Sequence, residues 1–582
     1  MNNPSGFTAR KARFLNRFHA RMTARGQNAT GFVSTPEPRT IGSFAKGKQL
    51  LAGNYVFAGH LVEAPGVSLW DVVPPDAEYL TEIHGFSWLD DLASVGDAPA
   101  RELAQIWLSE WVDRFGRGRG PGWTPDLTGR RLIRWINHAV LLLQGRKAAQ
   151  SAAFFQSLSH QTRFLSRRWH GALPGVPKFE ALTGLIYSSL ALMGFEALAE
   201  PAVRALAQEA ADQIGAEGAL PTRNPEELLD VFVLLTWAAV ALEDANKRVP
   251  PAHFDAIERI TPTLRALRHS DGSLARFHGG GRGREGWLDQ ALATSGIKTQ
   301  QNEGLSMGYA RLSAGRTSVI VDASPPPSGQ ASFNAHASTL AFELTSGRRP
   351  LIVSCGSGAA FGSEWRRAAR TTPSHSALVL DGQSSAAFGP AARGSAQEAL
   401  VNGPEHVPVE MSQAPDGLRF QGGHDGFAAA YGLTHARSLE LTFDGRSLSG
   451  EDMLLSLQDT HKRQFDKAMD AVKLKGIPFE IRFHLHPEVD AALDMNGSAV
   501  SIALKSGEIW VFRQDGAGVL TLQPSVYLEQ GRLKPRNAQQ IVLAGRATEY
   551  GTRIRWSFAK AQDTAIGVRD LTQDTPYWSD EL

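Results

Sequence analysis

Hydrophobic positions along the 582-residue chain follow two different periods. Between about residues 99 and 270, apolar side chains recur at i, i+3, i+4 and i+7, as they do in amphipathic helices. Examples are ARELAQIWLSEWVDRFG, GRRLIRWINHAVLLLQG, FEALTGLIYSSLALMGFEAL and PEELLDVFVLLTWAAVALED. Short breaks that contain Gly or Pro separate most of these segments, which predicts antiparallel neighbouring helices in a bundle, a solenoid or a closed helical ring.

The period changes after the glycine-rich stretch HGGGRGREG, residues 278–286. Short runs of alternating or β-branched residues follow, separated by Asp-Gly and Ser-Gly turn signals, for example STLAFELTSGRRPLIVSCG and SAVSIALKSGEIWVFRQDG. Such a density of strands predicts a large antiparallel sandwich. We therefore expect a basic N-terminal segment with a short strand-bearing prelude (1–98), a helical domain (99–285) and a β-sandwich (286–582).

Composition narrows the class of protein. Hydrophobic residues make up 42% of the chain and charged residues 20%, as in globular domains. A formal net charge of +1 gives no electrostatic case for nucleic acid as a partner. Cys355 is the single cysteine, so an intramolecular disulfide is excluded. No stretch approaches the roughly 18 apolar residues of a transmembrane segment.

The N-terminal stretch FTARKARFLNRFHARMTARG is rich in Arg and Lys, and the first acidic residue is Glu37. It lacks the apolar region and the small-residue cleavage site of a secretory signal. This pattern predicts a solvated basic helix or, alternatively, a segment that rests on an anionic membrane surface.

Two histidines, His336 and His375, stand just ahead of predicted strands, in FNAHASTLAFELTSGRRP and RRAARTTPSHSALVLDG. Three arginines accompany the second, and Asn334 shares a strand face with His336. A cleft with these groups suits an acidic polymer, and it suits β-elimination at a uronic acid, which needs a neutralised carboxylate, a base and an acid. Hydrolysis by paired carboxylates is the alternative, with Asp90/Asp91 and Glu226/Glu227 as candidates.

Four segments of the chain resemble motifs of the heparinase II/III-like proteins. They are NAHASTLAFELTSGRRPLIV, EWRRAARTTPSHSALVLDGQSS, HDGF with THARSLEL, and ADQIGAEGALPTRNPEELLDVF. The resemblance runs from about residue 99 to the end, and it implies an incomplete (α/α) toroid followed by an antiparallel β-sandwich. It also implies polysaccharide lyase activity.

The resemblance maps family site positions onto this chain, with departures. His336 and His375 match metal-ligand histidines, whereas Asn334 stands where the family has a catalytic histidine and Ser354 where it has a metal-ligand aspartate. We predict catalytic roles for His336, His375, Tyr187 and Asn334, and substrate binding by Arg223, Asn224, Arg366 and Arg370. His336 and His375 are also the predicted ligands of one zinc-like divalent metal.

The predicted function is therefore β-elimination on an acidic, uronate-containing polysaccharide. The alternatives are a catalytically impaired binder of acidic glycans and an envelope-assembly protein whose grooves hold a protein partner. The family implies the periplasm or cell envelope as the location, and the N-terminal sequence favours the cytoplasm as the alternative.

Overall fold

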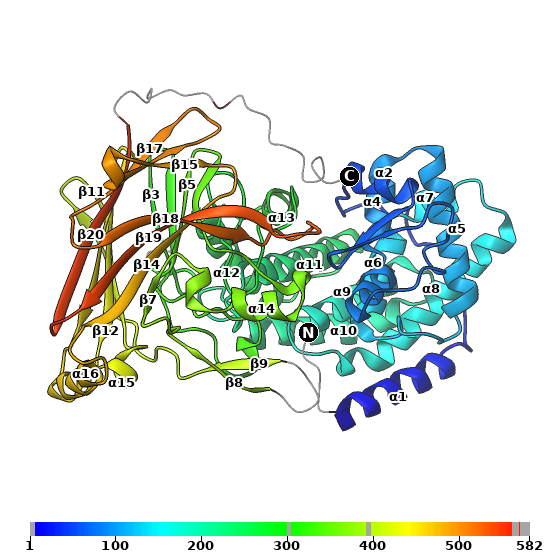
Figure 1. Cartoon of the computed structure of the whole chain (residues 1–582). Coiled ribbons are helices and arrows are strands. Elements are labelled where there is room, and N and C mark those ends of the chain that lie inside the picture. The colour runs from blue at the N-terminus through cyan, green and yellow to red at the C-terminus, as the bar shows by residue number, and fades with distance from the viewer. Residues whose placement is uncertain (1–5, 299–303, 392–396, 562–569, 571–582) are drawn as a thin grey trace.

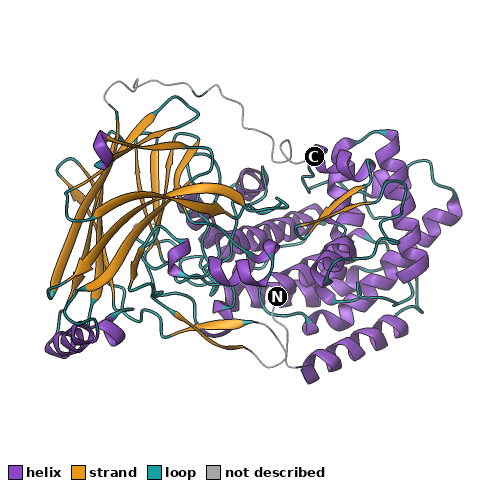
Figure 2. Ribbon diagram, viewed as in Figure 1, coloured by secondary structure: helices purple, strands orange, loops and turns teal. Residues whose placement is uncertain are grey.

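The computed structural model describes residues 6–298, 304–391, 397–561 and 570. Helices and strands separate into two bodies, with a helical domain on the right of Figure 1 and a β-sandwich on the left. Figure 2 shows the same division by secondary structure. The expected fold class, an incomplete toroid followed by an antiparallel sandwich, is confirmed.

The N-terminal segment is more helical than the strand-bearing prelude we expected. A two-stranded hairpin is present, and its partners are helices. The elements are α1 (Gly6–Met22), α2 (Phe44–Leu51), β1 (Asn54–Phe57), β2 (His60–Glu63), α3 (Ala77–Gly85) and α4 (Ser87–Val95). Asp76 caps α3 by accepting from the Tyr79 N–H, which explains why that helix begins there.

The helical domain continues with the series of amphipathic helices that the spacing predicts. They are α5 (Ala98–Phe115), α6 (Pro125–Asn137), α7 (Ala139–Leu143), α8 (Ala148–Arg168), α9 (Val176–Ala191), α10 (Ala199–Gln213), α11 (Pro225–Asp244), α12 (Pro251–Ala266) and α13 (Trp287–Ser295). Helices α6 and α9 pack closely because Gly129 and Gly184 face each other, and a side chain at Gly184 would overlap the Gly129 backbone. Helical structure extends to Ser295, beyond residue 285, where we placed the domain boundary.

Two eight-stranded antiparallel sheets form the sandwich. One has the order β10-β11-β12-β13-β20-β17-β16-β15. The other has the order β18-β19-β14-β6-β5-β4-β3, with β7 paired to β14. The strands of these sheets are β3 (Tyr309–Ala314), β4 (Thr317–Asp322), β5 (Phe342–Ser346), β6 (Arg349–Val353), β7 (Leu378–Leu380), β10 (Val409–Ala414), β11 (Gly417–His424), β12 (Thr434–Thr442), β13 (Ser447–Leu455), β14 (Ile477–Leu485), β15 (Asp490–Asp494), β16 (Ala499–Ala503), β17 (Ile509–Gln514), β18 (Val519–Tyr527), β19 (Arg536–Ala547) and β20 (Gly551–Lys560).

Shorter elements decorate the sandwich. They are β8 (Ala387–Ala391), which pairs with β9 (Glu398–Val401), and helices α14 (Ser363–Ala369), α15 (Ala428–Tyr431) and α16 (Asp459–Ala471). Between the sheets, the Trp556 ring stacks on Phe342 with centroids 5.7 Å apart and fills the space over Gly450 on the neighbouring strand. Its indole N–H donates to Asp452, 2.8 Å away, so this polar group is satisfied inside the core.

Candidate functional site

His336 and His375 lie side by side where the two domains meet. His336 follows a 3₁₀ turn and precedes β5, and His375 ends the 3₁₀ turn Thr372–Ser374 ahead of β7. Their ring centroids are 4.7 Å apart. A third ring, that of His278 from the glycine-rich stretch, lies with its centroid 5.9 Å from that of His336. The sequence predicts one site for the first two histidines and assigns no role to His278, which begins the glycine-rich stretch.

All three rings are sealed from solvent. The exposed fraction is 1% for His278, 1% for His336 and 0% for His375. Burial lowers the pKa of His375 to about 3, and it holds the pKa values of His278 and His336 well below the usual range. The three imidazoles are therefore neutral at pH 7, and a polymer in solution does not reach them in this structure.

Backbone N–H groups occupy the nitrogens of His336. The N–H of His278 donates to its Nδ1 at 3.1 Å, and the N–H of Gly279 faces its Nε2 at 2.9 Å. In return, the His336 N–H donates to Nδ1 of His278 at 3.1 Å. This reciprocal pairing ties the glycine-rich stretch to the sandwich.

The same contacts decide how well the histidines fit a metal. A neutral imidazole has one lone pair, and two N–H groups compete for the lone pair of His336. His375 Nδ1 lies 3.0 Å from the Ser354 hydroxyl, and a neutral hydroxyl is a weak ligand for zinc. Within the described part of the chain, no group of three or more His, Cys, Asp or Glu side chains is placed to hold a metal ion. The residues present do not fit the predicted zinc-like ion.

Asp322 joins the histidine cluster to the helical domain. Its Oδ1 accepts from the Arg223 guanidinium at 2.6 Å, and its Oδ2 accepts from the Ser338 hydroxyl at 2.7 Å. His278 Nε2 lies 3.4 Å from the same Oδ2. Asp322 has an exposed fraction of 0% and ends β4.

Arg223 is held by both domains rather than facing a cleft. Its guanidinium also donates to the carbonyl oxygens of Met307, Gly308 and Pro325. Tyr309 donates its hydroxyl to the Arg223 carbonyl at 2.6 Å. Asn224 caps α11, because its side-chain oxygen accepts from the N–H groups of Glu226 and Glu227 at 2.9 and 3.2 Å. Substrate binding by Arg223 and Asn224 stays a prediction.

The predicted arginines of the sandwich differ in access. Arg370 is 4% exposed and donates to the carbonyl oxygens of Ser332, Ala335 and Glu398 at 2.8–2.9 Å. Burial lowers its pKa to about 10. Arg366 is half-buried and donates to the side-chain oxygen of Asn334 at 2.7 Å. Arg366 and Asn334 are therefore predicted site residues of the sandwich that solvent still reaches.

Tyr187 lies far from the histidines. Burial raises its pKa, and the nearest charges that act on it are those of Arg39 and Asp244, at the C-terminal end of α11. Arg223 and Asn224 precede the other end of this 20-residue helix, which at 1.5 Å per residue is about 30 Å long. The structure thus brings Asn334, His336, His375, Arg366 and Arg370 into one region, with Arg223 and Asn224 beside it, and leaves Tyr187 out.

Two carboxyl groups in the helical domain have raised pKa values, and the sequence named only one of them, Asp91, as part of the Asp90/Asp91 pair. Burial raises the pKa of Asp230 to about 7 and that of Asp91 to about 6, and Arg284 opposes both shifts by its charge. Asp230 lies one helical turn after Glu226, whose carboxylate accepts from the Gly281 N–H at 2.7 Å. Perturbed carboxyls of this kind are candidates for proton transfer. No spacing signal marks Asp230 in the sequence.

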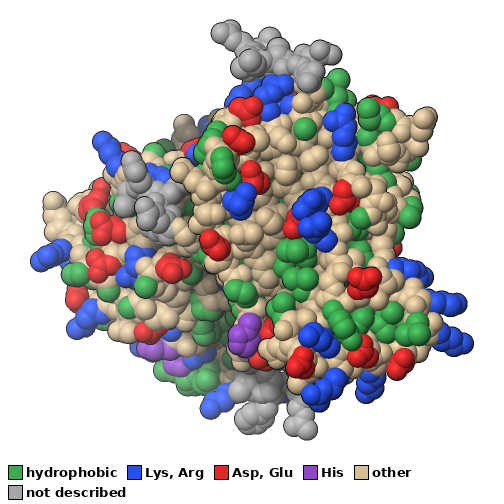
Figure 3. Space-filling model, turned by 90° about the vertical axis from the view of Figure 1, so that its left-hand side faces the viewer, with side chains coloured by type: hydrophobic (Ala, Val, Ile, Leu, Met, Phe, Trp, Pro, Cys, Tyr) green, Lys and Arg blue, Asp and Glu red, His purple; other side chains and the backbone are tan. Residues whose placement is uncertain are grey.

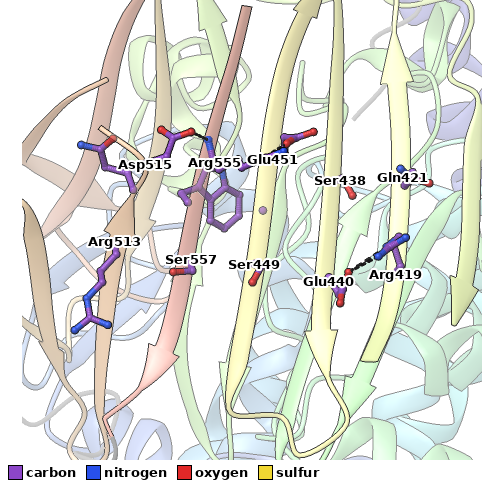
Figure 4. Close-up of a pocket in the computed structure, with 13 residues that line it drawn as sticks. Arg419, Gln421, Ser438, Glu440, Ser449, Glu451, Arg513, Asp515, Arg555 and Ser557 are labelled. Carbon is purple, nitrogen blue, oxygen red and sulfur yellow. Dashed lines mark hydrogen bonds and ion pairs between the residues drawn. The ribbon is translucent and has the colours of Figure 1, made fainter. Parts of the chain in front are cut away.

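A shallow hollow of about 540 Å³ lies on the outer face of the sheet that contains β11, β12, β13, β17 and β20 (Figure 4). Three arginines and three carboxylates line it, and serine side chains form its floor. The charges are paired across strands, with Arg419 2.7 Å from Glu440 and Arg555 2.6 Å from Glu451. The hollow therefore lacks the excess positive charge that a uronate polymer would favour.

The helical toroid and the two-sheet sandwich together form a heparinase-like fold. The family model described as heparinase II/III-like, C-terminal, matches residues 297–557. The chain belongs to the heparinase II/III-like family. Among the described residues, no helix has the length and apolarity required to cross a membrane.

Relatives and solved structures agree with this family. FtsZ-localized protein C of Caulobacter vibrioides (strain NA1000 / CB15N) is 30% identical over 535 residues, which cover 90% of this chain and 89% of the relative. The crystal structure of heparinase III aligns with a TM-score of 0.68 at 13% identity, over 95% of this chain and 90% of that one. A heparan sulfate lyase HepC mutant from Pedobacter heparinus aligns with a TM-score of 0.56 at 15% identity, over 94% and 88%. At such identities the structural likeness shows the fold alone.

Proposed function

We propose that this chain is a non-catalytic member of its family that acts as a binding protein at sites where FtsZ assembles. The observation that carries this proposal is the burial of His336 and His375, which are 1% and 0% exposed. General acid–base catalysis requires a side chain within hydrogen-bond reach of the substrate proton. The His336 ring instead accepts from the glycine-rich stretch across the domain interface, and the His375 ring contacts Ser354 inside the sandwich.

The other groups needed for β-elimination support the same view. A lyase must neutralise the substrate carboxylate. The Nε and Nη2 groups of Arg370 instead donate to three backbone carbonyls. Arg223 is committed to Asp322 and to carbonyl groups of the sandwich. Catalysis would require the domains to separate and to break these contacts together.

A relative that shares 30% identity over most of the chain supports the proposed location. Its name, FtsZ-localized protein C, describes where that protein is found. We infer that this chain shares that location, and that its surface, rather than an interdomain cleft, makes the contacts.

The proposal is tested by two measurements on the full-length chain. A fluorescent fusion should form bands that coincide with FtsZ in the source organism, and purified protein should leave the ultraviolet absorbance of a panel of uronate polymers unchanged. A matched control is the His336→Ala, His375→Ala double variant, which should likewise produce no increase in ultraviolet absorbance. Growth of the unsaturated-uronate signal with the native chain and its loss with the variant would contradict the proposal.

A second candidate is lyase activity on an acidic polysaccharide, with the half-buried Arg366 and Asn334 as the substrate-facing pair. An amide and a guanidinium side by side suit a sugar carboxylate. Arg366→Ala separates the two candidates, since it should abolish any uronate binding measured by calorimetry while leaving localisation with FtsZ intact.

A further inference from the structure

Helix α1 presents its apolar side to solvent. Phe14, Phe18 and Met22, at i, i+4 and i+8, are 68%, 48% and 50% exposed. The two phenyl rings stack with centroids 6.4 Å apart and an interplanar angle of 15°. Helices of globular proteins normally turn such a stripe toward the core.

The opposite side of α1 is the one that contacts the helical domain, and it is small and polar. Asn16, Ala20 and Thr23 are buried, with 7%, 0% and 2% exposed. Asn16 accepts from the Arg168 Nε at 2.8 Å, and the Ala20 carbonyl lies 2.5 Å from Nε2 of His160. These contacts fix the rotation of the helix, so the outward direction of the phenylalanines follows from specific polar contacts with α8.

Cations flank the apolar stripe. The exposed charged residues of the helix are all basic: Arg10, Lys11, Arg13, Arg17 and Arg21. Arg167 of α8 lies near enough to contribute to lowering the pKa of His19, although burial is the larger cause. Gly118 packs against Ala20, which places the exposed Arg117 and Arg119 beside the helix.

This one-signed surface contrasts with the sandwich end of the molecule. There, Lys and Arg alternate with Asp and Glu over the whole visible face (Figure 3). Helix α1 lies along the outer edge of the helical domain in Figure 1.

We propose that α1 is an interfacial helix that binds an anionic lipid bilayer, with Phe14, Phe18 and Met22 entering the acyl boundary and the flanking basic side chains meeting acidic headgroups. Arginine and lysine beside exposed aromatic residues are the composition of helices that lie in the membrane interface. The charge favours an acidic surface, and the convex stripe favours a plane over a peptide, because a peptide ligand is usually held in a groove.

The proposal is tested by sedimentation of the full-length protein with vesicles, without FtsZ or sugar, so that its outcome is independent of the proposed function. Vesicles of phosphatidylcholine alone are compared with vesicles that contain phosphatidylglycerol. The native chain should bind the acidic vesicles at least tenfold more tightly, and binding should weaken at high salt. Arg13→Gln with Arg17→Gln should reduce the binding about fivefold for each charge removed.

The apolar contribution is tested with Phe14→Ser and Phe18→Ser together, which should weaken binding by at least tenfold. The matched control is Leu457→Ser with Leu474→Ser, which changes two side chains that are 64% and 69% exposed beside α16, at the other end of the molecule, and should bind like the native chain. An unchanged melting temperature shows that each variant is folded.

Three results would overturn the proposal. They are equal binding to neutral and acidic vesicles, native-like binding by the Phe14→Ser, Phe18→Ser variant, and no vesicle binding together with self-association that this variant abolishes. The last result would make a second copy of the chain the occupant of the stripe.

Discussion

The guanidinium of Arg223 in the helical domain lies 2.6 Å from the carboxylate of Asp322 in the sandwich, and the side chains are 11% and 0% exposed. Neither charge has much access to water, so each depends on the other. The same carboxylate accepts a hydrogen bond from the Ser338 hydroxyl and lies near the His278 ring. One ion pair thus couples the two domains and the histidine cluster.

Removal of this carboxylate charge should uncouple the domains. Asp322→Asn leaves Arg223 buried without its counter-ion, and we expect a loss of about 3–5 kcal/mol in the free energy of unfolding. Scanning calorimetry should then resolve two transitions in place of one. Asp244→Asn is the control, since it breaks the exposed pair with Arg39 and should cost less than about 1 kcal/mol. Equal losses of unfolding free energy in the two variants would show that the interdomain ion pair stabilises the protein no more than the exposed pair does.

The buried histidines should make the protein sensitive to acid. His375 has a folded-state pKa of about 3 and binds its proton in the unfolded chain near pH 6.5, so its contribution to stability is present above pH 6.5 and is lost as the pH falls toward 3. His375→Gln should reduce the stability difference between pH 7.5 and pH 5.5 by about 1.4 kcal/mol. Urea unfolding at the two pH values measures this difference, and any pH-independent cost of the substitution cancels.

His406, whose side chain is 81% exposed, provides the control for that experiment. His406→Gln should leave the pH dependence unchanged. If His375→Gln also leaves it unchanged, the imidazole of His375 is accessible to protons in the folded state, and the burial argument against catalysis fails with it.

Asp230 should act in the opposite direction. Its pKa is raised to about 7 in the folded chain, so the folded state holds a proton that the unfolded state has already lost, and stability falls as the pH rises from about 4 through 7. Asp230→Asn should therefore stabilise the protein by about 4 kcal/mol at pH 8 and have little effect at pH 4. Asp212→Asn, at an exposed position of α10, should show neither effect. A uniform gain at both pH values would assign the effect to packing.

The two roles open to Asn224 can be separated by stability. Asn224→Ala removes the cap of α11 and should cost about 1 kcal/mol, whereas Asn224→Asp retains an acceptor and should restore most of it. Thermal unfolding measures both variants. A native melting temperature for Asn224→Ala would contradict the capping role and favour contact with a ligand.

The fold was predictable from periodicity because each domain repeats one pattern many times. Helices such as α11 keep their apolar positions over five turns, and β12 alternates buried and half-buried residues along its whole length. Single misplaced residues do not alter such a pattern. The helices of the N-terminal prelude were not predicted, because α2, α3 and α4 contain only 8–9 residues each and are too short to show a clear helical period.

The site was predictable only in part, because access to solvent depends on segments distant in sequence. The sequence predicts His336 and His375 in one site, but the burial of His336 depends on contacts with His278 and Gly279 of the glycine-rich stretch. The sequence also identified Arg370 as a charge without showing the three carbonyl groups that surround it. Likewise, the basic composition of α1 was evident, whereas the outward direction of Phe14 and Phe18 depends on Asn16 and α8.

The stretch from His278 to Gly281 is hydrogen-bonded to both domains, to His336 of the sandwich and to Glu226 of α11. A hinge needs a segment whose backbone is free to rotate. In this segment, backbone N–H groups donate to side chains of both domains. The two domains should therefore move as one rigid body, so that a force applied at α1 is transmitted to the far end of the sandwich without bending between the domains.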